Sequence, residues 1–367
     1  TYTLLLLAYA ASNLPYSALS GVLTGDMSER NSLSSYRFAA VMFAQFFVQV
    51  FMLPIILHVG NGDKAAGIES VMTWMAIIGT VLLLITFLTT KERVVPRPEQ
   101  QASLKEDLRD LFKNRPWIIM LTLTILVFVT LAMKGGSYVY YFNNYVDEAA
   151  LQSFIQPILD SLSAIGLNFF ESDVASAGFG LFNAGGIIFS MIGIAVSRKL
   201  ADKFGKRDVF GITLFIATLF IASFIFYNPE DVRLMFIAQA LHMFFYGVTT
   251  PILWAMIADV ADYSEWINNR RATAIIFSAM MVGLKAGLAI GGAIVTWILG
   301  LYGYVSKDAV AAGQELVQPE SVAQGAKMLV SIYPSIPFLI GVALLFFYEI
   351  NKSKEVQIQK DLLSKRV

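Results

Sequence analysis

The chain has 367 residues, of which 56% are hydrophobic and only 15% are charged, against about 25% charged residues in an average soluble domain. Its net charge is zero and it contains no cysteine, which argues against a nucleic-acid partner and excludes disulfides, thiolate metal sites and cysteine nucleophiles in this chain. The two histidines, His58 and His242, cannot form a zinc site by themselves. The charges gather between long apolar runs, which predicts an all-α protein that crosses a membrane many times.

Nine apolar runs are long enough to cross a bilayer core of about 30 Å. They cover residues 1–24, 32–57, 68–89, 116–142, 174–198, 208–228, 232–262, 270–302 and 327–350. The first run has no basic segment before it and no small-residue cleavage pattern after it, so it is not a signal peptide. Because the chain opens at Thr1 inside an apolar run and without a methionine, we expect three further spans to precede it.

The lysines and arginines of the loops gather on one side of the membrane, and the positive-inside rule makes that side, with the C-terminus, cytoplasmic. The longest cytoplasmic loop, 91–115, is the expected linker between two helical bundles at 1–90 and 116–350. Residues 351–367 form a cytoplasmic tail. On the outer side, 143–173 has no Lys or Arg; we expect a loop at the surface, with room for a short interfacial helix.

Lys285 stands in the middle of the eighth run, about 15 residues from either end. At 1.5 Å per residue its ammonium is too far from both interfaces to reach them. A lysine at the bilayer centre costs about 2.5–3.5 kcal/mol on insertion scales, so a partner charge is expected. Two explanations are open for this lysine: it forms a structural ion pair within the bundle, or it lies on a transport path.

Asp259 and Asp262 end the seventh run and share one helix face, since they are three residues apart. Arg270 and Arg271 follow after a short polar break. This cluster is compatible with charges that only fix topology and with a cytoplasmic gate, an ion-pair network that breaks when the protein opens inward.

Other polar and aromatic residues stand inside the first, second, fourth and seventh runs. Asn13 and Tyr16 can hydrogen-bond sugar hydroxyls or make an interhelical contact. Arg37 can line a cavity or extend to the cytoplasmic headgroups. Trp254 can lie against a sugar face or pack at the interface. Lys134 is deep enough to line the outer half of a path.

Several segments together resemble the glycoside–pentoside–hexuronide:cation symporter family of the major facilitator superfamily, which includes the melibiose carrier. The pieces in chain order are NLPYSAL, ERNSLSSYRF, TKER, SLKEDLRDLFKNRPW, KGGSYVYYF, RKLADKFGKR and ADVADYSEW…RRATAIIFS…LKAG. The last piece is the most specific, whereas RKLADKFGKR alone indicates only the superfamily. The resemblance extends over essentially the whole chain.

The resemblance implies two six-helix bundles, alternating access, and sugar uptake driven by Na⁺ or H⁺, with helices four to twelve present here. It implies no cofactor beyond the co-transported cation and no bound metal, and it places the protein in the inner (plasma) membrane. Lys285 corresponds to an eleventh-helix lysine near the cation and sugar sites. The remaining matched positions are Tyr9, Asn13 and Tyr16 (fourth helix, facing the sugar), Arg37 (fifth helix, sugar pocket), Trp254 (tenth helix, near the sugar), and Asp259, Asp262 and Arg271 (cytoplasmic gate).

One departure bears on the substrate: the position of Asn13 is an aspartate in the melibiose carrier, which puts a galactoside specificity in doubt. Three alternatives to sugar symport remain open. They are a transporter of a lipid or of an anionic (uronic or sulfonated) sugar, which Arg37 and Lys285 would suit; a non-transporting sensor of the same fold; and a membrane enzyme acting on lipid-linked sugars.

Overall fold

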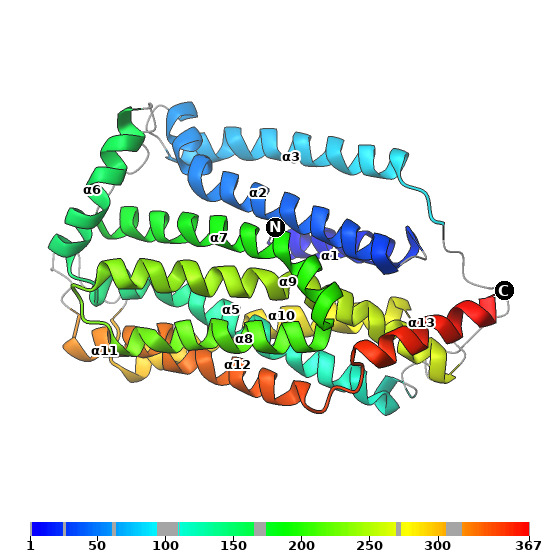
Figure 1. Ribbon diagram of the computed structural model, residues 1–367. Helices are drawn as coiled ribbons and strands as arrows, with labels where there is room; N and C mark the ends of the chain where they lie inside the picture. Colours follow the sequence, from blue (N-terminus) through cyan, green and yellow to red (C-terminus); the bar gives the residue numbers. More distant parts are fainter. Residues whose placement is uncertain are drawn as a thin grey trace.

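The structure is a computed structural model that describes residues 2–24, 27–60, 64–93, 109, 111–164, 174–268, 273–305 and 318–366. Within these ranges the regular structure is helical. Figure 1 shows long helices lying side by side along one axis, with α6 (Glu148–Ala164) at one end and α13 (Lys352–Arg366) at the other. The two ends of the helices are therefore marked by different elements.

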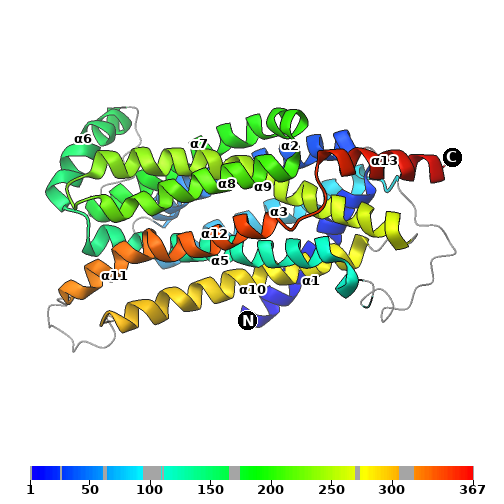
Figure 2. The same cartoon turned by 60° about the horizontal axis from the view of Figure 1, so that its bottom comes forward.

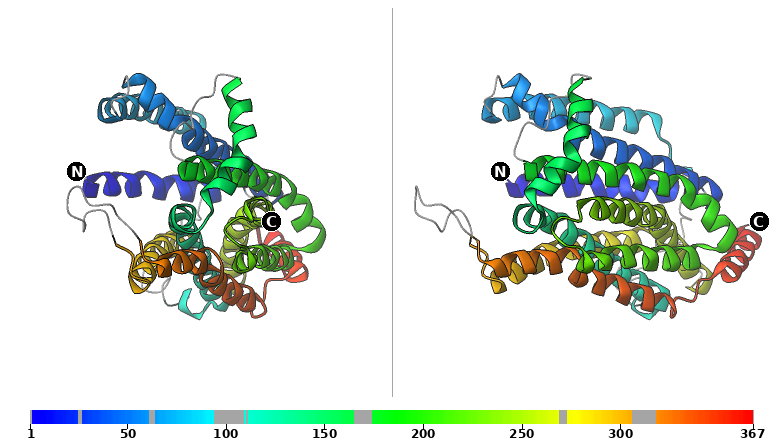
Figure 3. Two further views of the ribbon diagram at one scale, coloured as in Figure 1. Left: turned by 90° about the vertical axis from the view of Figure 1, so that its left-hand side faces the viewer. Right: turned by 60° about the vertical axis from the view of Figure 1, so that its left-hand side comes forward.

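The first three helices form one side of the molecule, as the view from the α6 end shows (Figure 3). They are α1 (Tyr2–Val22), α2 (Met27–Val59) and α3 (Lys64–Thr89). The second helix packs on two helices of the other side, α7 (Val174–Phe204) and α9 (Val232–Asn268), and α1 packs on α10 (Thr273–Leu301), which Figure 2 shows close to it. Large apolar side chains of α3 such as Ile77 and Leu82 are exposed, as expected of a surface that contacts lipid or further helices.

The other side, called here the larger bundle, is built from α5 and α7 to α12. Its remaining helices are α5 (Arg115–Asn144), α8 (Lys206–Ala222) with a 3₁₀ turn at Ser223–Phe226, α11 (Glu320–Val330) and α12 (Ile332–Leu345). The first of these begins at a capped end, because the Asn114 side chain accepts a hydrogen bond from the Trp117 amide at 3.0 Å. Small residues allow close packing: a Cβ on Gly247 of α9 would meet the Ser190 carbonyl of α7.

Seven helices in the described part of the chain are long and apolar enough to cross a membrane. They are Ala66–Thr89, Arg115–Asn144, Val174–Phe204, Lys206–Phe226, Val232–Asn268, Ile275–Leu301 and Glu320–Leu345; a shorter apolar helical segment, Tyr36–Val48, lies within α2. The two other expected spans, 1–24 and 32–57, coincide with α1 and α2. The helices thus follow the apolar runs read from the sequence.

The last expected span, 327–350, differs in detail, because the helix begins earlier and is broken at Ser331. Pro334 has no amide hydrogen to donate to the carbonyl four residues before it, which interrupts the helical hydrogen bonds. Two serines and a threonine bond to carbonyls around the break: Ser331 Oγ to Lys327 O, Ser335 Oγ to Ser331 O, and Thr130 Oγ1 to Pro334 O.

Two expected connecting segments contain helices. Within 143–173 the expected short helix is present as α6, which buries Leu151 and Ile155, while 165–173 lies outside the described residues. The segment 351–367, expected as a tail, contains α13, which buries Ile358 and Leu362 in the core. Most of the 91–115 linker lies outside the described residues.

Candidate functional site

Lys285 of α10 lies beside the first helix. Its Nζ is 5.4 Å from the centroid of the Tyr9 ring of α1, and both side chains are exposed, Tyr9 by 52%. The described residues offer Lys285 no carboxylate in an ion pair. This ammonium therefore stands at the junction of α1 and the larger bundle, on an aromatic face and open to a ligand.

Arg37 of α2 occupies a similar junction. Its guanidinium carbon is 5.0 Å from the Tyr16 ring of α1 and 5.8 Å from the Trp254 ring of α9. Buried Phe38 packs beside it, 6.2 Å from Trp254 between ring centroids. The guanidinium is thus held among three rings contributed by three helices, and no carboxylate of the described residues forms an ion pair with it.

Arg37 and Lys285 contact tyrosines on the same face of α1. Tyr9, Asn13 and Tyr16 are four and three residues apart, a spacing that aligns side chains along one stripe of α1. Asn13 is half-buried between the two tyrosines. The structure therefore brings six predicted site residues into one region, which we call the inter-bundle site: Tyr9, Asn13, Tyr16, Arg37, Trp254 and Lys285.

The chemistry of the inter-bundle site suits a polar ligand with apolar faces. Arg and Lys provide five and three hydrogen-bond donors, Asn provides donors and an acceptor, and tyrosine hydroxyls do both. Exposed rings offer flat apolar surfaces. Sugars combine hydroxyls with apolar C–H faces, and an acidic group on such a ligand would pair with Arg37 or Lys285.

The end of the larger bundle that lies beside α13 holds a different arrangement of charge. Buried Asp259 accepts two hydrogen bonds from Lys206 Nζ, at 2.7 and 2.8 Å, and the same ammonium lies 2.8 Å from Glu355 Oε1 of α13. Both Lys206 and Asp259 are at most 6% exposed. One cation therefore joins two carboxylates from α9 and α13, and we call these residues the charge triad.

A glycine turn positions Lys206 for this role. Gly205, between α7 and α8, has φ = 92°, a backbone conformation that favours glycine. The chain reverses there, so that Lys206 begins α8 beside the end of α9. A Cβ at Gly205 would lie 3.0 Å from the Lys352 Cβ of α13, so the turn also makes room for the last helix.

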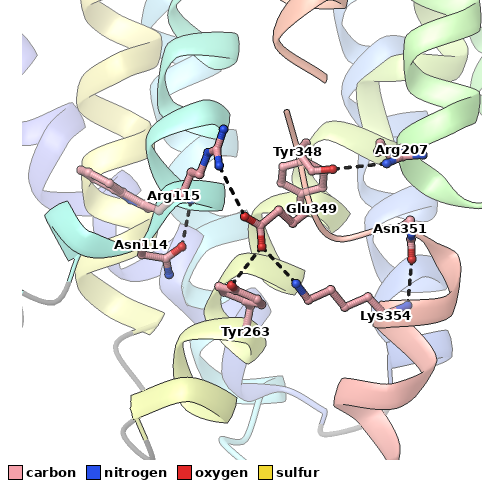
Figure 4. A network of polar contacts seen from close by, with 9 residues as sticks. Asn114, Arg115, Arg207, Tyr263, Tyr348, Glu349, Asn351 and Lys354 are labelled. Carbon is pink, nitrogen blue, oxygen red and sulfur yellow. Dashed lines mark hydrogen bonds and ion pairs between the residues drawn. The ribbon is translucent and has the colours of Figure 1, made fainter. Parts of the chain in front are cut away.

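A second set of contacts holds α13 and the segment before it (Figure 4). Glu349 accepts a hydrogen bond from Lys354 Nζ at 3.0 Å and lies 3.9 Å from Arg115 Nη1. Trp266 Nε1 donates to Asp361 Oδ2 at 2.9 Å. One end each of α5, α9 and α13 are therefore tied together by polar contacts as well as by packing.

Buried Tyr348 completes this end of the molecule. Burial, with the nearby charges of Asp259 and Glu355, raises the pKa of the Tyr348 phenol well above its ordinary value. The phenol therefore stays protonated and donates to the Met256 carbonyl, at 3.4 Å. It closes the space around the charge triad without adding another charge.

The predicted gate residues have three different outcomes. Asp259 belongs to the charge triad, Asp262 is buried three residues further along α9, and Arg271 lies outside the described residues. The partner of Asp259 is Lys206, which sequence reasoning did not single out although it stands in the quoted segment RKLADKFGKR. Glu355 was missed as well; Ile358 and Leu362, three and seven residues after it, are the helical pattern that could have indicated docking of this segment.

The described residues contain no group of three or more His, Asp or Glu that could hold a metal ion. Two arrangements of charge stand out in the described residues: the paired charge triad beside α13, and the cations Arg37 and Lys285 between the first helices and the larger bundle. Within the described residues, a transported cation would therefore need ligands other than a cluster of His, Asp and Glu side chains.

Comparison with known proteins gives consistent matches. The family profile described as MFS/sugar transport protein matches residues 1–172 and 161–352. A protein of Escherichia coli (strain K12) provisionally named glycoside/cation symporter YagG is 30% identical over 367 residues, which is 100% of this chain and 72% of that protein. The inner membrane symporter YicJ of the same organism is 31% identical over 345 residues, covering 93% of this chain and 66% of its own length.

A solved structure shares the fold. The crystal structure of a variant of the Escherichia coli fucose:proton symporter FucP matches with a TM-score of 0.59 and 16% identity, over 92% of this chain and 73% of that one. At this identity the likeness concerns the fold alone. It confirms the expectation of a major facilitator fold for the helices described above.

Proposed function

Because this chain belongs to the MFS/sugar transport family along most of its length, and within it to the glycoside–pentoside–hexuronide:cation symporters, we propose that it carries a sugar or glycoside into the cell together with Na⁺ or H⁺. The family consists of transporters, so the chain is a multi-pass membrane transporter and not an enzyme. The proposal concerns the substrate, the driving ion and the residues that bind them.

The observation that carries the proposal is the meeting of two open cations with aromatic faces between the first helices and the larger bundle. Lys285 faces Tyr9 across α10 and α1, and Arg37 lies between Tyr16 and Trp254. Transporters of this kind bind their substrate near the midplane, where the two bundles meet. Arg37, Asn13 and the tyrosine hydroxyls bind the sugar, Trp254 supports its apolar face, and Lys285 links the sugar to the cation site.

Transport then follows from a change in which side of the inter-bundle site is closed. Residues 1–90 and 116–350 act as the two bundles, with 91–115 as the linker and 351–367 as the cytoplasmic end. The charge triad and the contacts of α13 belong to the closed cytoplasmic gate, and Asp262 and Arg271 take part in it. The C-terminus lies in the cytoplasm, and the protein lies in the inner membrane.

A second candidate substrate is an anionic sugar. Arg37 and Lys285 both contact aromatic rings, and neither forms an ion pair with a carboxylate of the described residues, so each is available to pair with a uronic or sulfonic group. A charge-assisted hydrogen bond contributes about 1.5–3 kcal/mol, more than a neutral one. A neutral glycoside and a glucuronide are therefore the two substrates to compare directly.

The test is uptake by the full-length protein in membrane vesicles. A panel of galactosides, glucosides, xylosides and glucuronides is offered with a Na⁺ gradient or a proton gradient imposed separately. Accumulation of one glycoside under one gradient supports the proposal and identifies both partners. Absence of gradient-driven accumulation across the panel contradicts sugar symport.

A further inference from the structure

Lys134 of α5 is a second lysine inside a membrane span, and it lies in a different environment from Lys285. Its side chain is only 6% exposed and is enclosed in the larger bundle, not at the inter-bundle site. Its Nζ lies 5.3 Å from the centroid of the Tyr138 ring, one turn further along the same helix. This ammonium makes no hydrogen bond or ion pair with a described residue.

The groups around Lys134 are polar and buried. Tyr138 donates to Gln239 Oε1 of α9 at 2.9 Å and packs edge-on against Phe182 of α7, with ring centroids 4.9 Å apart. His242 stands one turn further along α9 than Gln239. All these polar residues are at most 3% exposed. The cluster therefore joins α5, α7 and α9 inside the bundle.

The imidazole of His242 donates a hydrogen bond to the backbone of α8. Its Nδ1 is 3.0 Å from the Ala217 carbonyl of α8, and since a carbonyl oxygen only accepts, Nδ1 carries the proton. The ring also stacks on Tyr246, which in turn stacks on Phe338 of α12. His242 thus contributes no negative charge to balance an ammonium at Lys134.

The helices that pack on Lys134 place no carboxylate beside it in the described chain. The helix α5 itself and α10 contain no Asp or Glu, and neither does α12. On α7, α8, α9 and α11 the acids stand near the helix ends: Asp202, Asp208, Asp259, Asp262, Glu265 and Glu320. The other titratable groups facing this region are Tyr138, Tyr141, His242 and Tyr246; the lysines of α10 and α11 are directed at Tyr9 and Tyr145.

Two effects then compete at Lys134. A desolvated contact with an aromatic ring stabilises an ammonium by about 2 kcal/mol. Removing the ion from water costs several kcal/mol in a real protein interior, and burial without a counter-charge is ordinarily resolved by loss of the proton. Because the second effect is larger, the amine is neutral in the packed conformation and becomes charged when water or a negative group reaches it.

We propose that Lys134, buried beside Tyr138 in the larger bundle, is a proton-binding site separate from the inter-bundle site. The step is the addition of one proton to a neutral amine, giving an ammonium, when the bundle opens. The inference rests on the proposed symport and specifies the driving ion as H⁺. Lys134 is then a coupling residue, and Lys285 acts at the substrate.

The first experiment measures protonation without transport. The apparent unfolding temperature of the full-length protein in detergent is followed from about pH 7 to about pH 10, below the ordinary lysine value of ~10.4. A neutral buried lysine binds one proton fewer in the folded state, so it makes stability rise with pH in this interval. Lys134→Met should lose that component and be more stable than the parent protein near neutral pH.

The matched control is Lys327→Met. Lys327 also lies over a tyrosine ring, 4.9 Å from the centroid of Tyr145, but it is partly exposed at the end of α11. This variant should keep the pH-dependent component. Equal pH dependence in the parent protein and in Lys134→Met would overturn the proposal, because the lysine would then be charged in the fold. A Lys134→Met protein that fails to fold while Lys134→Gln folds would also overturn it.

The second experiment tests coupling in proteoliposomes. Lys134→Met should lose accumulation driven by a proton gradient and keep exchange of labelled for unlabelled sugar, which needs no net proton movement. Retained proton-driven accumulation in this variant contradicts the coupling role. If the parent protein accumulates no sugar under any gradient, the proposed symport fails, whereas the pH dependence of stability still reports on the proton site.

Discussion

The inter-bundle site and the charge triad each contain a lysine, but the surroundings of the two lysines are opposite. In the charge triad, Lys206 is buried between Asp259 and Glu355, with nitrogen–oxygen distances of 2.7 to 2.8 Å. At the inter-bundle site, Lys285 and Arg37 lie on aromatic rings, and Lys285 is exposed. This difference distinguishes charges that maintain a conformation from charges that can bind a ligand. Paired buried charges hold helices together, whereas cations on exposed rings can still bind a ligand.

The largest effect on stability is expected when the cation of the charge triad is removed. Lys206→Met leaves Asp259 and Glu355 beside each other without a partner, and breaking a buried pair in this way costs about 3–5 kcal/mol. We expect a marked loss of thermal stability in detergent, and a weaker loss when Asp259→Asn is added, since the buried carboxylate is then neutral.

The control for this prediction is the exposed pair Arg198–Asp202, whose atoms are 3.7 Å apart. Arg198→Met should change stability by about 1 kcal/mol or less, since exposed ion pairs contribute little. Equal effects at Lys206 and Arg198 would show that the charge triad is not a special contact.

A second variant distinguishes an anionic from a neutral substrate at the inter-bundle site. Arg37→Ala removes the guanidinium between Tyr16 and Trp254. A bond to a charged group contributes about 1.5–3 kcal/mol, so the half-saturation concentration for a glucuronide should rise about tenfold or more. The rise for a neutral glycoside should be smaller. Initial rates of uptake for both sugars measure this, and a larger rise for the neutral sugar would exclude an anion partner for Arg37.

Trp254 offers a smaller effect and a matched control. Trp254→Leu removes the ring beside Arg37, and an aromatic contact of this kind contributes about 0.5–1 kcal/mol at an exposed site. Half-saturation for the transported sugar should rise about twofold to fivefold. Trp266→Phe, which removes the hydrogen bond to Asp361 of α13, should leave the half-saturation concentration unchanged. Equal shifts in both variants would mean that Trp254 acts through the fold.

The smallest expected effect concerns the ion pair between Arg115 and Glu349. Their atoms are 3.9 Å apart, and the side chains are 63% and 38% exposed. Arg115→Ala should change the unfolding free energy by about 1 kcal/mol or less. Thermal unfolding measures this, and a loss as large as that of Lys206→Met would show that this exposed pair contributes as much as the buried charge triad.

The sequence was most informative where a residue is costly in its own helix. Lys285 stands at the centre of an apolar run, so its importance follows from the expense of a buried charge, and its helix was found within a few residues. The sugar-facing positions expected for Tyr9, Arg37 and Trp254 rest on the family resemblance, because nothing in their local spacing indicates which helices meet. The structure brings these residues together.

Other features depend on contacts that no local pattern contains. Lys206 and Glu355 are separated by most of the larger bundle in sequence, so their shared partner Asp259 could not be identified from spacing. The inward direction of Lys134 was not visible either, because a membrane helix is apolar on its lipid face and on its core face. The break at Ser331 arises from Pro334 in a run whose hydropathy is continuous.

The most direct test of the account is concentrative uptake by the full-length protein carrying Lys285→Ala, with Lys327→Ala as the control lysine. The account predicts that Lys285→Ala abolishes accumulation of the transported glycoside while the protein remains in the membrane, and that Lys327→Ala accumulates it normally. Unchanged accumulation with Lys285→Ala would contradict the account and reduce Lys285 to a residue that only packs α10 against α1.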